Sequence, residues 1–112
     1  MNLRMRFIQY CEGDIEDVNY PDSYTFSNCK TKLSKRPDVN ALMILDSLID
    51  GDKPFIDGDE LSQYELPLQI NLEELNSKIS DEQIQDLICC GVRCGGGYDC
   101  LYLLTAYGYD YK

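Results

Sequence analysis

The sequence predicts a small α+β domain, with a three- to four-stranded, mostly antiparallel sheet and two to three helices. Three observations support this prediction. The chain has 112 residues, of which 44% are hydrophobic, as is typical of one folded domain. Several short segments alternate between apolar and polar residues, as half-buried strands do. Other segments carry apolar residues at helical spacing beside residues that cap helices. We therefore treat residues 1–112 as a single domain.

The first part of the chain predicts two strands. Leu3, Met5 and Phe7 alternate with their neighbours, which favours a half-buried strand. Tyr24 and Phe26 alternate in the same way, and the second strand would pair with the first as a hairpin. A loop with a short helical turn at residues 15–18 is expected between them.

The segment from Pro37 to Gly51 predicts the clearest helix. Proline suits the first helical position because its missing N–H would have no partner there. Asp38 lies in the first turn, where the helix dipole favours an anion. A broad apolar stripe follows, which implies a well-buried helix, and Gly51 is expected just beyond its end.

A third strand and two capped helices are expected in the following part of the chain. Alternation over residues 66–72 predicts the strand, and Pro67 confines it to an edge or a bulge because proline donates no ladder hydrogen bond. Asn71 and Ser80 each stand three residues before Glu or Gln, the pattern of a capping box. The second helix is expected to stop at Gly91.

The last part of the chain is expected to begin with a turn at Gly95 to Gly97. These glycines lack the GxxxxGK spacing of a phosphate-binding loop. The segment from Tyr98 to Tyr109 then fits either a short helix capped by Asp99 or a strand.

The net charge of −10 lies in one stretch of the chain. Twelve carboxylates and two lysines fall between Asp46 and Asp86, and each flanking segment is neutral overall. Such a charge is felt beyond one Debye length, about 8–10 Å at physiological salt. The sequence therefore predicts a basic protein partner. It argues against direct binding to nucleic acid, whose phosphates would be repelled, and the basic run from Lys30 to Arg36 is expected to be solvated or paired with acids of this chain.

Six of these carboxylates and three tyrosines form the predicted partner-binding set. Four other acids, Glu73, Glu74, Asp81 and Glu82, stand at predicted helix starts, where they compensate helix dipoles. No such local role is evident for the acids between Asp50 and Glu65. Tyrosine is enriched at interface hot spots, and five of the nine tyrosines fall in the last fifteen residues. The predicted set is Asp50, Asp52, Asp57, Asp59, Glu60, Glu65, Tyr107, Tyr109 and Tyr111.

Catalysis and metal binding find little support in the residue types present. The chain has no histidine, which is the commonest general base and metal ligand. The six cysteines lack paired CxxC spacing, so we expect core thiols, with a four-cysteine zinc site and a disulfide or redox role as the alternatives. The acidic stretch fits no EF-hand register, because Pro54 or Leu61 would occupy position 5, which leaves an irregular calcium site as the alternative. We therefore expect no enzyme, no cofactor and no metal.

Together these features predict an acidic, stoichiometric inhibitor that occupies the nucleic-acid-binding surface of a basic nuclease or related complex. Phage anti-defence proteins, such as anti-CRISPR and anti-restriction proteins, have this profile. The alternatives are a bacterial immunity protein that neutralises a nuclease toxin and a non-enzymatic interaction adaptor. No signal peptide and no apolar run of about 20 residues is evident, so we expect a cytoplasmic location without membrane association. The sequence predicts no oligomeric state.

Overall fold

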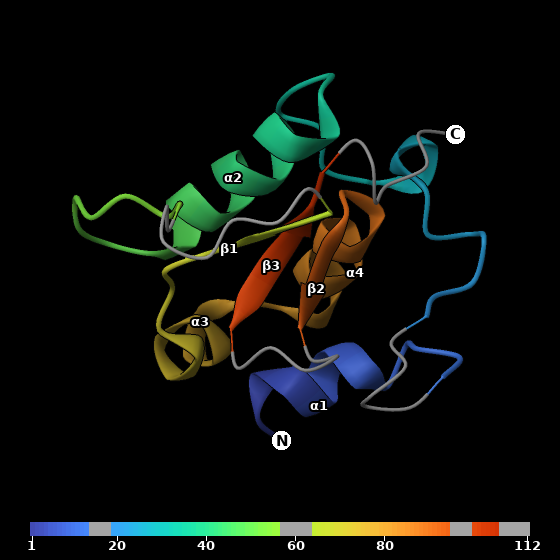
Figure 1. The fold of residues 1–112 in the computed structure, drawn as a ribbon, viewed down its shortest axis with the longest axis horizontal. Coiled ribbons are helices and arrows are strands. Elements are labelled where there is room, and N and C mark those ends of the chain that lie inside the picture. Colours follow the sequence, from blue (N-terminus) through green and yellow to red (C-terminus); the bar gives the residue numbers. More distant parts are fainter. Residues whose placement is uncertain (14–18, 57–63, 95–99, 106–112) are drawn as a thin grey trace.

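The computed structural model describes residues 1–13, 19–56, 64–94 and 100–105. Within these residues the chain forms helices and an antiparallel sheet, arranged as Figure 1 shows, which confirms the predicted α+β class. The elements are α1 (Leu3–Ile8), η1 (a 3₁₀ helix, Phe26–Asn28), α2 (Pro37–Leu48), β1 (Glu65–Pro67), α3 (Leu72–Lys78), α4 (Asp81–Cys89), β2 (Val92–Cys94) and β3 (Leu101–Leu104).

The described strands form one antiparallel sheet in the order β1-β3-β2. β3 is central, and its Leu103 lies opposite Leu66 on β1 and Val92 on β2. Tyr102 and Leu103 are both buried, although successive side chains of a strand point to opposite faces. The sheet is therefore covered on both faces around β3. Pro67 lies on the edge strand β1, as predicted, where a missing N–H donor is tolerated.

The N-terminal segment is a helix, so the strand predicted there is wrong. α1 buries Leu3 and Phe7, which lie four residues apart and therefore share one helix face. Met5, which a strand would place on the same side as both, is 45% exposed. The Asn2 side chain accepts a hydrogen bond from the Met5 N–H and caps the helix. The four-residue spacing of Leu3 and Phe7 is compatible with both the strand period of two and the helical period of about 3.6. The Asn2 cap and the packing of this segment favour the helix.

The segment predicted as a second strand, around Tyr24 and Phe26, is a loop that leads into η1. The Tyr24 ring contacts the rings of Tyr10 and Tyr20, with centroid separations of 6.4 and 5.8 Å. These contacts partly bury the three tyrosines without strand pairing. The predicted hairpin is therefore wrong, and α1 brings the α-helices of the described residues to four, above the predicted two to three.

The helix predicted from Pro37 is α2. It begins at Pro37 and ends at Leu48, earlier than the predicted end near Gly51. Gly51 has a φ of +113°, a left-handed conformation that favours glycine. Val39 and Met43 are 38% and 42% exposed, so α2 is less deeply buried than its broad apolar stripe predicts.

The two helices predicted after the edge strand are α3 and α4. The Asn71 side chain caps α3 by accepting a hydrogen bond from the Glu74 N–H. Ser80 and Gln83 form a complete capping box at the start of α4, with both reciprocal hydrogen bonds present. Gly91, with a φ of +93°, follows the end of α4 as predicted.

The core surrounds α4, which contacts α1, α2, η1 and β2. Ile84, Leu87 and Ile88 of α4 are fully buried. The C-terminal segment, whose sequence fits either a helix or a strand, forms the central strand β3 over residues 101–104. The turn predicted at 15–18 and the turn at 95–97 lie outside the described residues. No helix in the described part of the chain has the length and apolar character needed to cross a membrane.

Candidate partner-binding groove

A groove of about 710 Å³ opens where α2 ends, beside the start of α3. Both segments lie on the same side of the molecule in Figure 1. The lining includes three partly buried apolar side chains, Ile49, Phe55 and Ile70. Its charged residues within the described part of the chain are four carboxylates and one lysine, with a net charge of −3: Asp46, Asp50, Asp52, Glu74 and Lys53. The groove therefore combines an apolar surface with a negative rim.

Two of these carboxylates are held by a lysine of α3. The Lys78 Nζ lies 3.3 Å from an Asp50 oxygen and 3.2 Å from a Glu74 oxygen. Hydrogen bonds to Glu74 and to Asp50 raise the pKa of Lys78. Asp46 and Asp52 have no ion-pair partner among the described residues. The negative charge of the rim is therefore balanced only in part.

Apart from Asp38 in its first turn, the charges at the two ends of α2 oppose its helix dipole. Asp46 lies in the last turn and Asp50 follows it, close to the helix carbonyls that form the negative end of the dipole, and no basic residue stands in that turn. Lys35 and Arg36 precede the positive end. A charge placed unfavourably at a helix end costs about 0.3–1 kcal/mol. The stability of α2 therefore does not explain the positions of Asp46 and Asp50, and binding is a candidate role for them.

The structure describes three of the nine predicted partner-binding residues. Asp50 and Asp52 are exposed and both line the groove. Glu65 is half-buried at the start of β1, opposite Leu104, and does not line the groove. The other six lie outside the described residues: Asp57, Asp59, Glu60, Tyr107, Tyr109 and Tyr111.

The groove also contains residues that the sequence reasoning missed. Asp46 stands four residues before Asp50, a spacing that would have placed both on one side of the helix end. Glu74 was assigned only to helix capping, yet its side chain also contacts Lys78 and lines the groove. The apolar floor had no sequence signal, because Ile49, Phe55 and Ile70 meet only through the tertiary fold.

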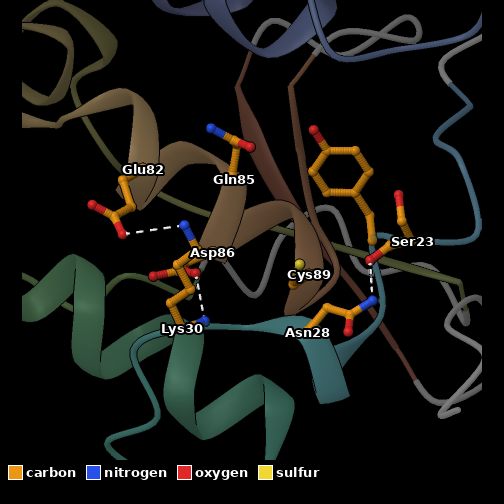
Figure 2. Close-up of a pocket in the computed structure, with 8 residues that line it drawn as sticks. Ser23, Asn28, Lys30, Glu82, Gln85, Asp86 and Cys89 are labelled. Carbon is orange, nitrogen blue, oxygen red and sulfur yellow. Dashed lines mark hydrogen bonds and ion pairs between the residues drawn. The ribbon is translucent and has the colours of Figure 1, made fainter.

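A second pocket, of about 280 Å³, lies between η1 and α4 (Figure 2). Asp86 is 3% exposed there, and its carboxylate accepts hydrogen bonds from the backbone N–H groups of Lys30 (2.9 Å) and Thr31 (3.2 Å). The Lys30 ammonium lies 3.6 Å from a Glu82 oxygen across the pocket, as Figure 2 shows. One member of the basic run is therefore paired with an acid of this chain, as expected. Asp86, the last of the twelve acids, holds the loop at residues 30–31 to α4.

The cysteines are mostly buried thiols. Cys29, Cys89, Cys90 and Cys94 are buried, and Cys11 and Cys100 are half-buried. Burial raises the pKa of Cys89 and of Cys94 to about 11, and it also raises the pKa of Cys29 and of Cys90. Over the described ranges, no three His, Cys, Asp or Glu side chains are grouped so as to hold a metal ion.

Comparison with protein-family models, with curated proteins and with solved structures gives no significant match. The charge of the groove, its apolar floor and its position at the end of α2 are therefore the observations from which a function is inferred.

Proposed function

We propose that this protein is an acidic, stoichiometric inhibitor that binds a basic nucleic-acid-handling protein of the cytoplasm through the groove at the end of α2. The observation that carries the proposal is the combination of Asp46, Asp50, Asp52 and Glu74 with an apolar floor in one groove. The first hypothesis for its biological class is phage anti-defence, with an RNA-guided nuclease or a restriction enzyme as the target.

The groove suits arginine or lysine side chains. Both residues have an aliphatic stem that packs on apolar surface and a charged end that seeks an anion. Ile49, Phe55 and Ile70 supply the apolar surface, and exposed carboxylates stand around it. Arginine also binds carboxylates through paired, charge-assisted hydrogen bonds. A side chain that normally contacts a phosphate would therefore find a comparable anion here.

Inhibition follows from competition for one surface. Proteins that bind nucleic acid depend on lysine and arginine contacts to phosphates for much of their affinity. A protein that occupies those side chains excludes the nucleic acid without any catalysis. Opposite charge also raises association rates by about 10–10³-fold, so a small acidic protein can compete with the nucleic acid for this surface.

A plating assay tests the proposal. Bacterial strains that each carry one nuclease defence, either RNA-guided or restriction, are infected with a sensitive phage in the presence and absence of this protein. We expect plaque formation to recover in at least one strain, and the purified nuclease from that strain to lose DNA binding at a one-to-one ratio of inhibitor. If no strain recovers and none of the purified nucleases binds the protein, the anti-defence proposal is wrong.

Two triple variants of equal net charge separate the groove from charge in general. The first replaces groove residues (Asp46→Asn, Asp50→Asn, Asp52→Asn), and the second replaces exposed acids outside the groove (Glu12→Gln, Asp22→Asn, Glu73→Gln). We expect the groove variant to lose inhibition and the control variant to keep most of it. Equal loss in both would show that net charge, rather than the groove, is responsible.

The immunity-protein alternative uses the same groove against a different target. In that case the protein would leave phage plating unchanged and would instead protect cells from an expressed nuclease toxin. The groove variant would lose this protection and the control variant would retain it.

A further inference from the structure

Two cysteines that are far apart in the sequence meet inside the core. The sulfur atoms of Cys29 and Cys90 lie 3.9 Å apart, although 61 positions separate the residues. Cys29 immediately follows η1, and Cys90 caps the end of α4. Both are free thiols, 6% and 1% exposed. The fold therefore places two thiols side by side without a covalent bond between them.

The Asn40 side chain holds this pair in place. Its Nδ2 lies 3.3 Å from the Cys90 sulfur and 3.6 Å from the Cys29 sulfur. The Cys29 thiol also lies 3.3 Å from the Thr31 carbonyl oxygen, which accepts a hydrogen bond from the same Asn40 nitrogen. The residue after η1, a side chain of α2 and the end of α4 thus hold the two sulfurs near each other. A disulfide bond needs a sulfur separation of about 2.05 Å. Side-chain rotation would therefore have to shorten the distance between the two sulfurs by less than about 2 Å.

We propose that Cys29 and Cys90 are a redox modification site, which a two-electron oxidant such as hydrogen peroxide converts into a disulfide. Cys29 is the more exposed of the two and reacts first. Its thiolate attacks one peroxide oxygen, the O–O bond breaks, and the products are a sulfenic acid on Cys29 and a hydroxide that takes up the thiol proton to become water. The Cys90 sulfur then attacks the Cys29 sulfur, the S–O bond breaks, and the departing oxygen leaves as a second water.

The electron count of this step is balanced. The two thiols together lose two protons and two electrons. The peroxide takes up these protons and electrons and is reduced to two water molecules. Both thiols are buried and neutral at pH 7, and the thiolate is the reactive form. The reaction should therefore be slow in dilute oxidant and need an excess of peroxide.

The disulfide would connect two segments that already touch. Asp86 binds the backbone of residues 30 and 31, and the new bond would join the preceding residue to the end of the same helix. A cross-link that closes a loop of about 60 residues restricts the unfolded chain strongly. The oxidised protein should therefore be more resistant to unfolding than the reduced protein, with the groove at the far end of α2 unchanged.

Peptide mapping tests this proposal. The full chain is treated with excess hydrogen peroxide, residual thiols are blocked with N-ethylmaleimide after denaturation, and the peptides are identified by mass spectrometry. We expect a Cys29–Cys90 cross-link as the main disulfide and a rise in thermal midpoint of at least about 5 °C, which dithiothreitol reverses. A Cys11→Ala control should keep the cross-link and the rise, and Cys90→Ala should lose both.

The mapping of the wild-type chain decides the matter even if Cys90→Ala fails to fold. The proposal is overturned if Cys29 and Cys90 are still maleimide-labelled after peroxide has oxidised other cysteines. It is also overturned if either sulfur is found mainly as sulfinic or sulfonic acid, or if Cys29 is joined mainly to Cys89 or to another cysteine.

Discussion

Asn40 illustrates how one buried amide fixes a loop that has no regular structure. Its side-chain oxygen accepts hydrogen bonds from the Leu33 N–H at 2.6 Å and the Ser34 N–H at 3.1 Å. Its nitrogen donates to the Thr31 carbonyl at 2.9 Å. Asn40 is 0% exposed, so water does not replace these bonds. The path of the chain from residue 31 to residue 34 therefore depends on this side chain of α2, together with the Asp86 carboxylate that accepts a hydrogen bond from the Thr31 N–H.

Replacing Asn40 by alanine should destabilise the protein strongly. The Leu33 and Ser34 N–H groups would lose their partner, the Thr31 carbonyl would keep only the Cys29 thiol, and an unpaired group away from water costs about 1–3 kcal/mol. We expect the free energy of unfolding, measured with urea, to fall by about 2–4 kcal/mol. The matched control is Asn71→Ala, which removes an exposed helix cap and should cost about 1 kcal/mol. Similar losses for both variants would contradict the role given to Asn40.

The buried thiols make stability sensitive to alkaline pH. A cysteine in the unfolded chain has the ordinary thiol pKa of 9.0, whereas burial raises the pKa of Cys89 and of Cys94 to about 11 in the folded state. The folded state therefore favours the neutral thiol. The stability that this provides is complete below pH 9 and is lost as the pH rises toward 11.

We expect the urea midpoint to fall steadily between pH 9 and pH 10.5. A double variant, Cys89→Ala with Cys94→Ala, should lose less stability over this interval because it lacks both titrating groups. A wild-type midpoint that is constant over this interval would show that the two thiols ionise equally easily in both states.

At the scale of the elements, α2 allows a direct test of the charge placement around the groove. Asp38 stands in its first turn and Asp46 in its last. Replacing Asp38 by asparagine removes a negative charge from the positive end of the dipole, and replacing Asp46 removes one from the negative end. We expect Asp38→Asn to lower the free energy of unfolding by about 0.3–1 kcal/mol and Asp46→Asn to raise it by a similar amount. Changes of the same sign, measured by urea unfolding at low salt, would rule out the dipole explanation.

Arg6 joins α1 to the turn between α3 and α4. Its guanidinium donates to the Asn76 backbone and side-chain oxygens and to the Ile79 carbonyl, at 2.9–3.0 Å, and pairs with Asp81 at 3.1 Å. Lysine cannot reproduce this fixed set of donors. We expect Arg6→Lys to lower the free energy of unfolding by about 1.5–3 kcal/mol, as measured with urea.

The Asp81→Asn variant is the matched control for Arg6. Asp81 is 63% exposed at its side chain, and an exposed ion pair contributes about 0–1 kcal/mol. If Asp81→Asn destabilises as much as Arg6→Lys, the ion pair rather than the backbone contacts holds α1 in place.

The helices with sequence-encoded caps were predictable, and the N-terminal elements were not. Pro37, Asn71 and Ser80 each mark a helix start by local chemistry, and the structure places helices at all three. The strand prediction over residues 3–7 failed because Leu3 and Phe7 satisfy the periods of both a strand and a helix. The groove was predictable only in part: Asp50 and Asp52 belong to the acidic stretch, whereas its floor is made by residues such as Phe55 and Ile70, from segments that meet only in the fold.

On the scale of the whole molecule, charge is distributed unevenly along α2. The loop before its first residue carries Lys30, Lys32, Lys35 and Arg36, and its last turn leads into the acidic groove. A basic partner would therefore meet attraction at one end of α2 and repulsion at the other. This asymmetry would orient the partner during approach as well as attract it.

The measurement that tests the proposed function most directly is the salt dependence of binding. The dissociation constant is measured between this protein and the nuclease identified by plating, at 50 and 300 mM NaCl, for the wild type, the groove triple variant and the control triple variant. We expect wild-type and control binding to weaken by about tenfold or more at the higher salt, because screening reduces attraction between exposed charges. The groove variant should bind weakly at both salt concentrations. Equal affinity and equal salt dependence for all three proteins would contradict binding through the acidic groove.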